Sequence, residues 1–96
     1  MLHVVLFEDD PQASAMRDRH MAAHLAFLAD NATRICAAGP LLEANNRPAG
    51  GLWLVDADDH EQVRALVEAD PFWPTGLRRS VRIVRWKQVF RDGAAL

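Results

Sequence analysis

The sequence predicts an α+β protein with the element order βαββαβ: a ferredoxin-like antiparallel sheet with two helices on one face, of the dimeric α+β barrel type. Two observations predict this fold class. Four runs rich in β-branched and large apolar residues have the length of strands, at residues 2–7, 33–38, 52–55 and 80–89. Two longer segments, after the first and third runs, have apolar residues at helical spacing.

Length, charge and cysteine content narrow the class of protein. The 96 residues fit one domain, predicted over residues 1–90 with a flexible tail at 91–96. A net charge of -2 argues against nucleic acid as a partner, and no apolar run approaches the ~20 residues that cross a membrane. The N-terminus turns acidic at Glu8–Asp10 and has no signal-peptide pattern. A single cysteine excludes an internal disulfide, so a cytoplasmic protein is expected.

The first strand and the first helix are predicted between residues 2 and 31. Leu2–Phe7 is dense in apolar residues, which is typical of a central strand buried on both faces. Asp10 can cap the helix that follows, and Pro11 fits its first position. We expect this helix to continue to Asn31. Its apolar face is predicted from residues at i, i+4, i+7 and i+11, namely Met21, Leu25, Leu28 and Ala32.

A hairpin is predicted next. The strand Thr33–Ala38 is expected to end at Gly39–Pro40, because proline offers no donor to a sheet ladder. Glu43–Gly51 is a turn-rich connector that leads into the third strand, Leu52–Val55. Cys36 is predicted to be a small buried residue rather than a nucleophile, since no base neighbours it in the sequence.

The second helix is predicted to begin after Asp59, which has capping-box spacing with Gln62. Asp70 follows on the same helical stripe, and Pro71 ends the helix. The core residues of this stripe are Val63, Leu66 and Val67.

The last strand is predicted over Ser80–Val89, with a bulge or a bend between Ile83 and Trp86, where the alternation slips. A sheet with both helices on one face leaves its other face bare. Trp53 and Trp86 are candidates for that face, and a second copy of the chain is the simplest cover. A homodimer is therefore expected.

His24 is the candidate chemical centre. It lies where the apolar face of the first helix meets the polar border, so its imidazole can be shielded from water and still reach a cleft. A histidine titrates near pH ~6.5 and can give or take a proton. A carboxylate from Asp70 that accepts from one ring nitrogen would leave the other free as general acid or base. The alternative is a core-edge histidine, with Asp70 capping the turn before Pro71.

Five further residues are candidates for substrate binding: Arg17, His20, Gly39, Pro40 and Phe72. Arg17 lies on the same flank of the first helix as His24, where it either binds an anionic or phenolate oxygen or stays solvated. His20 either lines the opening of the site or faces water. Gly39 and Pro40 either form a pocket wall or only end a strand. Phe72 either covers an aromatic substrate or fills the core or an interface.

Neither a metal nor a cofactor is expected. His20 and His24 have the spacing of two metal ligands on a helix, but no glutamate stands beside either one, and Asp70 would be a lone third ligand. No Gly-rich phosphate loop, serine elbow or CxxC motif occurs.

Taken in order, several short segments resemble the YCII-related (YciI-like) family over nearly the whole chain. These segments are Met1–Val5, Arg17 with His24–Leu25, Ala38–Leu41, Ala69–Phe72 and Val81–Phe90. The resemblance implies a ferredoxin-like α+β fold, usually dimeric, with a proposed His/Asp active site that falls on His24 and Asp70. One branch of the family is similar to a cofactor-free dehydrochlorinase acting on a chlorinated hydroxyhydroquinone. Members differ at the connector 43–51 and at the loop Phe72–Pro74, which leaves the substrate open.

Three hypotheses follow for function. The first is a small cofactor-independent enzyme in which His24 moves a proton on a small cyclic or phenolic substrate, Asp70 orients it and Arg17 steadies the developing charge. The second is a non-catalytic module that binds a small ligand or a partner, because this fold serves many functions. The third is a cofactor-free oxygenase of the dimeric α+β barrel type.

Overall fold

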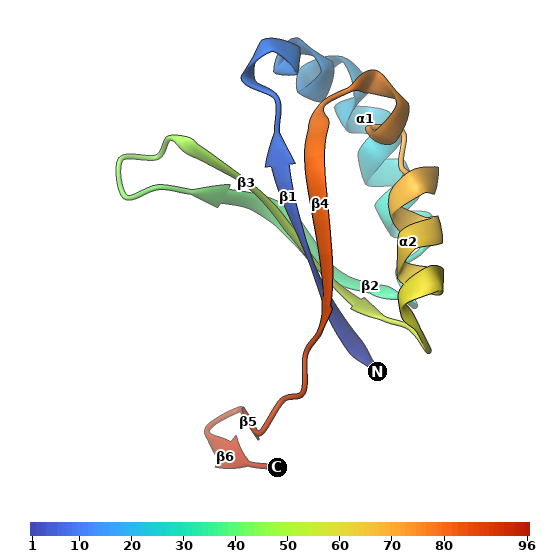
Figure 1. Cartoon of the computed structure of the whole chain (residues 1–96), viewed down its shortest axis with the longest axis vertical. Coiled ribbons are helices and arrows are strands. Elements are labelled where there is room, and N and C mark those ends of the chain that lie inside the picture. Colours follow the sequence, from blue (N-terminus) through green and yellow to red (C-terminus); the bar gives the residue numbers. More distant parts are fainter.

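A computed structural model describes all 96 residues as a four-stranded antiparallel sheet, covered on one face by two helices (Figure 1). The strands have the order β2-β3-β1-β4. The main elements are β1 (Leu2–Asp9), α1 (Ala15–Asp30), β2 (Ile35–Leu42), β3 (Pro48–Asp56), α2 (His60–Ala69) and β4 (Arg78–Arg85). The minor ones are η1 (Pro11–Ala13), η2 (Trp73–Thr75), β5 (Phe90–Arg91) and β6 (Ala94–Ala95). The predicted fold class and element order are confirmed.

β1 is central, as predicted, because it pairs with both β3 and β4. Its burial on both faces was a wrong prediction for the single chain. His3, Val5 and Phe7 are buried toward the helices, whereas the alternate residues Val4 and Leu6 are only half-buried. No helix covers the second face, so only one side of the strand lies in the core.

α1 begins later and turns a partly different face inward than the sequence predicts. The Asp10 carboxylate accepts from the Gln12 amide at 2.9 Å, but this caps the short η1 turn, and α1 itself starts at Ala15. The predicted apolar stripe is confirmed only in part: Leu28 packs against the core, but Leu25 is 56 % exposed and His24 is the buried residue of the helix. A helix this rich in alanine has several nearly equivalent apolar stripes, so contacts with other elements decide which one is buried.

The β2–β3 hairpin is confirmed, but both of its strands are longer than predicted. β2 does not end at Gly39–Pro40 and runs to Leu42, while β3 already begins at Pro48. β2 is an edge strand that pairs with β3 alone, so a residue without an N–H does not break the sheet. Cys36, predicted to be buried, is exposed on this edge strand.

α2 closely follows the sequence prediction. The Asp59 carboxylate accepts from the Gln62 amide at 2.9 Å, and the Gln62 side chain in turn accepts from the amide of Asp58 at 3.1 Å. The three predicted core residues, Val63, Leu66 and Val67, are buried. α2 ends at Ala69, directly before Asp70 and Pro71.

β4 ends at Arg85, so the predicted strand to Val89 is too long, and the change of pattern before Trp86 marks the strand end. The irregularity lies at the other end of the strand. There the pairing shifts between Glu8 and Asp9, and Asp9 pairs with Arg78. One extra residue on β4 at such a bulge re-aims the side chains beside it.

The two faces of the sheet have different surroundings. Trp53 was assigned to the bare face, but it is 1 % exposed and packs under the helices beside Phe7 and Phe27. Trp86, 42 % exposed, does lie on the bare side. The C-terminal segment, predicted to be a flexible tail, holds the β5–β6 hairpin and stands away from the sheet (Figure 1).

Candidate active site

The structure brings His24 and Asp70 together from two helices on the same face of the sheet. His24 Nδ1 lies 2.8 Å from Asp70 Oδ1, and both side chains are buried, with 8 % and 3 % of their surface exposed. An ionised carboxylate only accepts, so this bond places the proton on Nδ1 of the neutral imidazole. The nitrogen left as an acceptor is Nε2.

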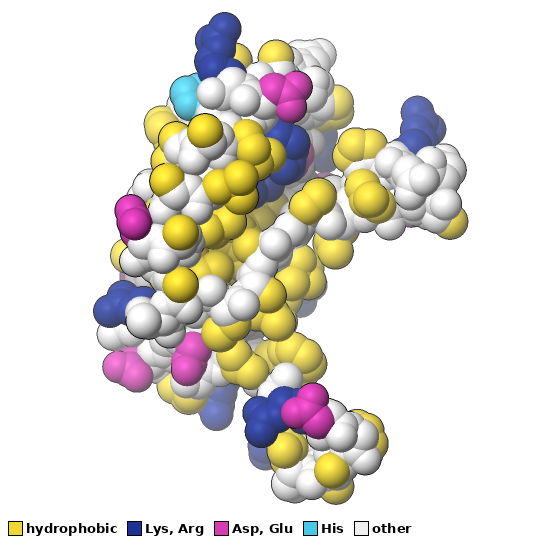
Figure 2. All heavy atoms as spheres, turned by 180° about the vertical axis from the view of Figure 1, so that it is seen from behind, with side chains coloured by type: hydrophobic (Ala, Val, Ile, Leu, Met, Phe, Trp, Pro, Cys, Tyr) yellow, Lys and Arg dark blue, Asp and Glu magenta, His cyan; other side chains and the backbone are white.

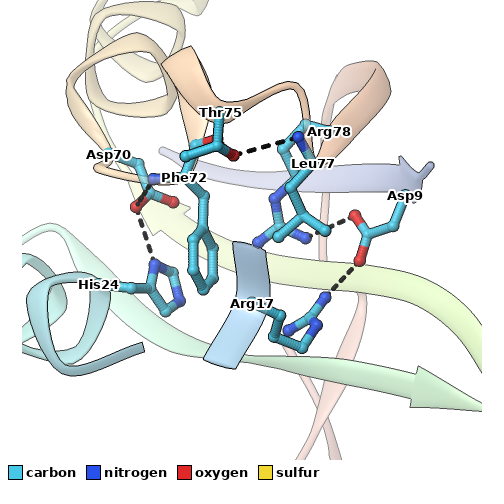
Figure 3. Close-up of polar contacts among 8 residues, drawn as sticks. All are labelled: Asp9, Arg17, His24, Asp70, Phe72, Thr75, Leu77 and Arg78. Atoms are coloured by element: carbon cyan, nitrogen blue, oxygen red, sulfur yellow. Dashed lines mark hydrogen bonds and ion pairs between the residues drawn. The ribbon is translucent and has the colours of Figure 1, made fainter. Parts of the chain in front are cut away.

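Local structure fixes the carboxylate. Asp70 is the C-cap of α2, in extended conformation, and Pro71 prevents the helix from continuing. The same oxygen, Oδ1, also accepts from the Phe72 amide at 3.1 Å. The Phe72 ring then stacks on the His24 ring, with centroids 4.1 Å apart and planes at 18° (Figure 3). The two hydrogen bonds and the stack together leave the imidazole little freedom.

His24 Nε2 faces a small, partly open cavity. This nitrogen has no hydrogen-bond partner in the chain. It is not fully buried either, because Arg78 Nε is the one fully buried side-chain polar atom without a partner. His24 Nε2 therefore keeps access to solvent. The cavity has a volume of about 130 Å³. Its lining includes Arg17, His24, Gly39, Pro40, Gly51 and Arg78.

A second polar group borders the same cavity. Arg17 Nη2 donates to Asp9 Oδ2, and Arg78 Nη1 donates to Asp9 Oδ1 at 2.9 Å. Phe72 lies between this group and His24, with the two guanidinium carbons 5.7 and 5.3 Å from its ring centroid (Figure 3). Two cations therefore share one carboxylate beside the cavity.

The sequence-predicted binding residues separate into two groups. Arg17, Gly39 and Pro40 line the cavity. His20 is half-buried on α1 and does not line it. Phe72 is completely buried and forms the stack behind His24, so it contacts the imidazole rather than the cavity space.

Sequence reasoning missed Asp9, Arg78 and Gly51. Arg78 comes at the start of the last strand among other basic residues, yet its side chain is 4 % exposed. A Cβ on Gly51 would lie 3.2 Å from Arg78 Nη1, so the glycine leaves the space that this guanidinium occupies. The signal in the sequence was the pair of an acid at the end of β1 and a base at the start of the last strand.

Two surface carboxyl groups have altered pKa values. Hydrogen bonds from Ser80 and Arg79, and the charge of Arg79, hold the pKa of Glu8 below its ordinary value. The N-terminal ammonium, which bonds to Asp56 at 2.8 Å, lowers the pKa of that carboxyl. Both groups are exposed, so these shifts belong to the surface and not to the cavity.

No group of three or more His, Cys, Asp and Glu side chains has the arrangement to hold a metal ion. Neither helix is long and apolar enough to cross a membrane.

Fold and site together define a class of protein: a ferredoxin-like α+β domain with a buried His–Asp pair beside a small cavity. The sequence model of the YCII-related domain matches residues 1–87, and the chain belongs to this family. No curated protein matches the chain significantly.

Two of the solved structures that are similar to the chain differ strongly in sequence identity. One is 5-chloro-2-hydroxyhydroquinone dehydrochlorinase from Burkholderia phenoliruptrix AC1100 in complex with 2,5-dihydroxybenzoquinone, with 32 % identity and a TM-score of 0.79. This match covers 91 % of the present chain and 94 % of that chain. The other is the protein At3g17210 from Arabidopsis thaliana, with 16 % identity, a TM-score of 0.50 and coverage of 95 % and 97 %, a likeness of fold alone.

Proposed function

We propose that the chain is a cofactor-independent enzyme that uses His24 and Asp70 for general acid–base chemistry on a small one-ring substrate. The observation that carries the proposal is the buried 2.8 Å contact from His24 Nδ1 to Asp70 Oδ1, with Nε2 left unpartnered at the cavity. An oriented imidazole with one free nitrogen is the usual arrangement for proton transfer in an enzyme.

The size of the cavity supports a one-ring substrate. Its volume is about 130 Å³, and a cavity of about 150 Å³ can hold benzene. A single ring with small substituents fits this space when part of it remains in the opening.

The reaction proposed is elimination of hydrogen chloride, because the similar dehydrochlorinase acts on 5-chloro-2-hydroxyhydroquinone. The step that His24 serves starts from the keto tautomer of the ring, which has a hydrogen on the carbon that bears chlorine; a hydroxyl proton passes to Nε2, and the electron pair of its bond shifts into the ring. The C–Cl bond breaks, and its electron pair leaves with chloride. Asp70 accepts from the imidazolium formed and steadies its charge. No bond to the protein is needed.

The test measures chloride release from 5-chloro-2-hydroxyhydroquinone by the wild type, His24→Gln and His20→Gln. Removal of a general acid or base costs about 10²- to 10⁴-fold in rate, so His24→Gln should lose at least about a hundredfold in kcat. His20→Gln, one turn away and outside the cavity lining, should retain the wild-type rate. Equal turnover by His24→Gln and the wild type would refute the proposal. Binding without chloride release would instead identify a non-catalytic ligand-binding module.

We also propose that the active form is a homodimer built on the bare face of the sheet. This face holds an apolar surface patch formed by Val4, Leu52, Leu54, Val84 and Trp86. The β2–β3 hairpin and the C-terminal segment project on the side away from the helices, and hydrophobic side chains gather between them (Figures 1 and 2). Isologous packing of this face against a second copy would cover it.

Light scattering during size exclusion tests the dimer. The wild type should have twice the chain mass of 10.7 kDa. Leu54→Glu places a charge in the apolar patch and should yield monomers, whereas Ala65→Glu, on an exposed position of α2, should not. A monomeric wild type would contradict this proposal and leave the dyad chemistry standing.

A further inference from the structure

We infer that Arg78, held by Asp9, is the oxyanion-binding residue of the cavity and that it selects ring substrates carrying a single negative charge. The inference deepens the proposed function and rests on it only in treating the bound ring as a substrate. It concerns the side of the Phe72 ring away from His24, where Arg17, Arg78 and Asp9 lie (Figure 3).

Within the group formed by Arg17, Asp9 and Arg78 the charges do not balance. Arg17 and Arg78 each donate to a different oxygen of Asp9, so two positive charges share one negative charge. A buried cation without full compensation is costly. Arg78 bears most of this cost, because its side chain is 4 % exposed and that of Arg17 is 28 % exposed. A bound anion would supply the missing charge.

Arg78 also has unused hydrogen-bond donors. Its Nη1 is occupied by Asp9, but Nε is fully buried without a partner. Nη2 has no partner in the chain either, and it is not fully buried. Since Arg78 lines the cavity, the Nη2 donors are available to an oxygen atom there. A free guanidinium edge is the group that proteins use to hold an oxyanion.

Aromatic rings keep the guanidinium in place. Its central carbon lies 4.1 Å from the Phe7 ring centroid and 5.3 Å from that of Phe72. Contacts with ring faces stabilise the cation without using its N–H groups. Arg78 is therefore preorganised, and its Nη2 donors and the buried Nε remain unsatisfied.

The surplus of one charge sets the substrate class. A phenolate, an enolate or another delocalised oxyanion of one ring neutralises the arginine pair with a single negative charge. The assignment fits the proposed chemistry, because negative charge that develops as His24 takes a proton can spread through the ring to the oxygen at Arg78. A dianion exceeds the available positive charge, and a neutral ring leaves it uncompensated.

The test uses 4-nitrophenol, whose neutral and ionised forms absorb at different wavelengths, and 4-nitrotoluene, a neutral ring of similar size. We expect the wild type to bind the phenolate at least about tenfold more tightly than 4-nitrotoluene. The bound phenol should then ionise at least about one pH unit lower than the free phenol, since one unit corresponds to a tenfold preference. Equal affinity for the two probes would overturn the inference.

Variants assign the preference to Arg78. Arg78→Gln should weaken phenolate binding about 10- to 100-fold and leave 4-nitrotoluene binding within about threefold. Arg17→Gln should cause a smaller loss. Arg64→Gln is the matched control, because Arg64 also pairs with a carboxylate and lies over an aromatic ring, but on α2 outside the cavity. A phenolate preference that survives Arg78→Gln would contradict the assignment.

A second variant covers the case in which Arg78→Gln does not fold. Arg78→Lys keeps a cation beside Asp9, so it should retain a reduced preference for the phenolate. Complete loss or full retention of this preference would refute a role that depends on the planar guanidinium. The binding test is independent of turnover. A phenolate preference that persists in His24→Gln, alongside unchanged turnover in that variant, would remove the proposed acid–base function and leave this site intact.

Discussion

Asp70 is expected to stabilise the fold and to serve the chemistry, and two substitutions separate these roles. In Asp70→Ala the His24 Nδ1–H and the Phe72 amide both lose their acceptor in a buried position. Each buried donor left without a partner costs about 1–3 kcal/mol, so the free energy of unfolding should fall by about 2–6 kcal/mol. This is a large part of the ~5–15 kcal/mol that holds a typical domain together.

Asp70→Asn should behave differently, because both hydrogen bonds converge on the same oxygen, Oδ1. An amide oxygen at that position keeps both contacts and loses only the extra strength of a charged acceptor, about 1 kcal/mol. Urea unfolding followed by circular dichroism measures the difference. Asp30→Ala, at an exposed carboxylate without a side-chain hydrogen bond, is the control and should change stability by less than about 0.5 kcal/mol. Unfolding of Asp70→Ala at the wild-type urea concentration would refute the reasoning.

Three further predictions concern the cavity lining, two glycines with positive φ and a surface carboxylate. Gly51→Ala puts a methyl group 3.2 Å from Arg78 Nη1 and should weaken 4-nitrophenolate binding in the absorbance titration; unchanged affinity would show that the space is not needed. Gly50→Ala places a Cβ 2.1 Å from a β1 carbonyl at a residue with φ +97°, and it should lower the free energy of unfolding in urea by about 2–5 kcal/mol. Gly76→Ala has the same backbone strain, at φ +80°, but no neighbouring atom in the way, and should lower it by about 1–2 kcal/mol. Equal losses of stability in the two variants would argue against the clash at Gly50. Glu8 has a lowered pKa, so its contribution to stability is present above the ordinary glutamate value of 4.5 and is lost as the pH falls through the folded value. Glu8→Gln should therefore flatten the acid side of the stability profile, and an unchanged slope would contradict this.

The fold could be predicted from the sequence because local signals and the resemblance agreed. Three signals in α2 depend only on residues close by in the sequence: the cap at Asp59, the spacing of the three core residues and the helix end before Pro71. The position of Asp70 follows from the same local signals. His24 lies in the core beside Asp70, although only part of the apolar stripe used to place it is buried.

Arg78 could not be placed in this way. Strict alternation from the inward residue Val81 would turn Arg79 toward the helices and Arg78 away from them. The register shift opposite Asp9 reverses this, so Arg78 is buried and Arg79 is exposed. A bulge depends on pairing between distant strands, and a pattern read along one strand does not contain it.

Two other wrong predictions have the same origin. Gly39–Pro40 was read as a strand end because proline lacks a donor, but that cost vanishes when the strand lies at the edge of the sheet. Alternation along the strand places Trp53 opposite to Leu52 and Leu54, but it does not say which face the helices cover. Edge position and covered face are both properties of the assembled sheet.

The orientation of a single imidazole can be measured directly by ¹⁵N NMR of the His24 side chain, at a mildly alkaline pH where histidines are neutral. Our account predicts a proton on Nδ1, directed at Asp70, and an unprotonated Nε2 whose resonance shifts when 4-nitrophenol enters the cavity. A proton resident on Nε2, or a ring that averages between both tautomers, would contradict it.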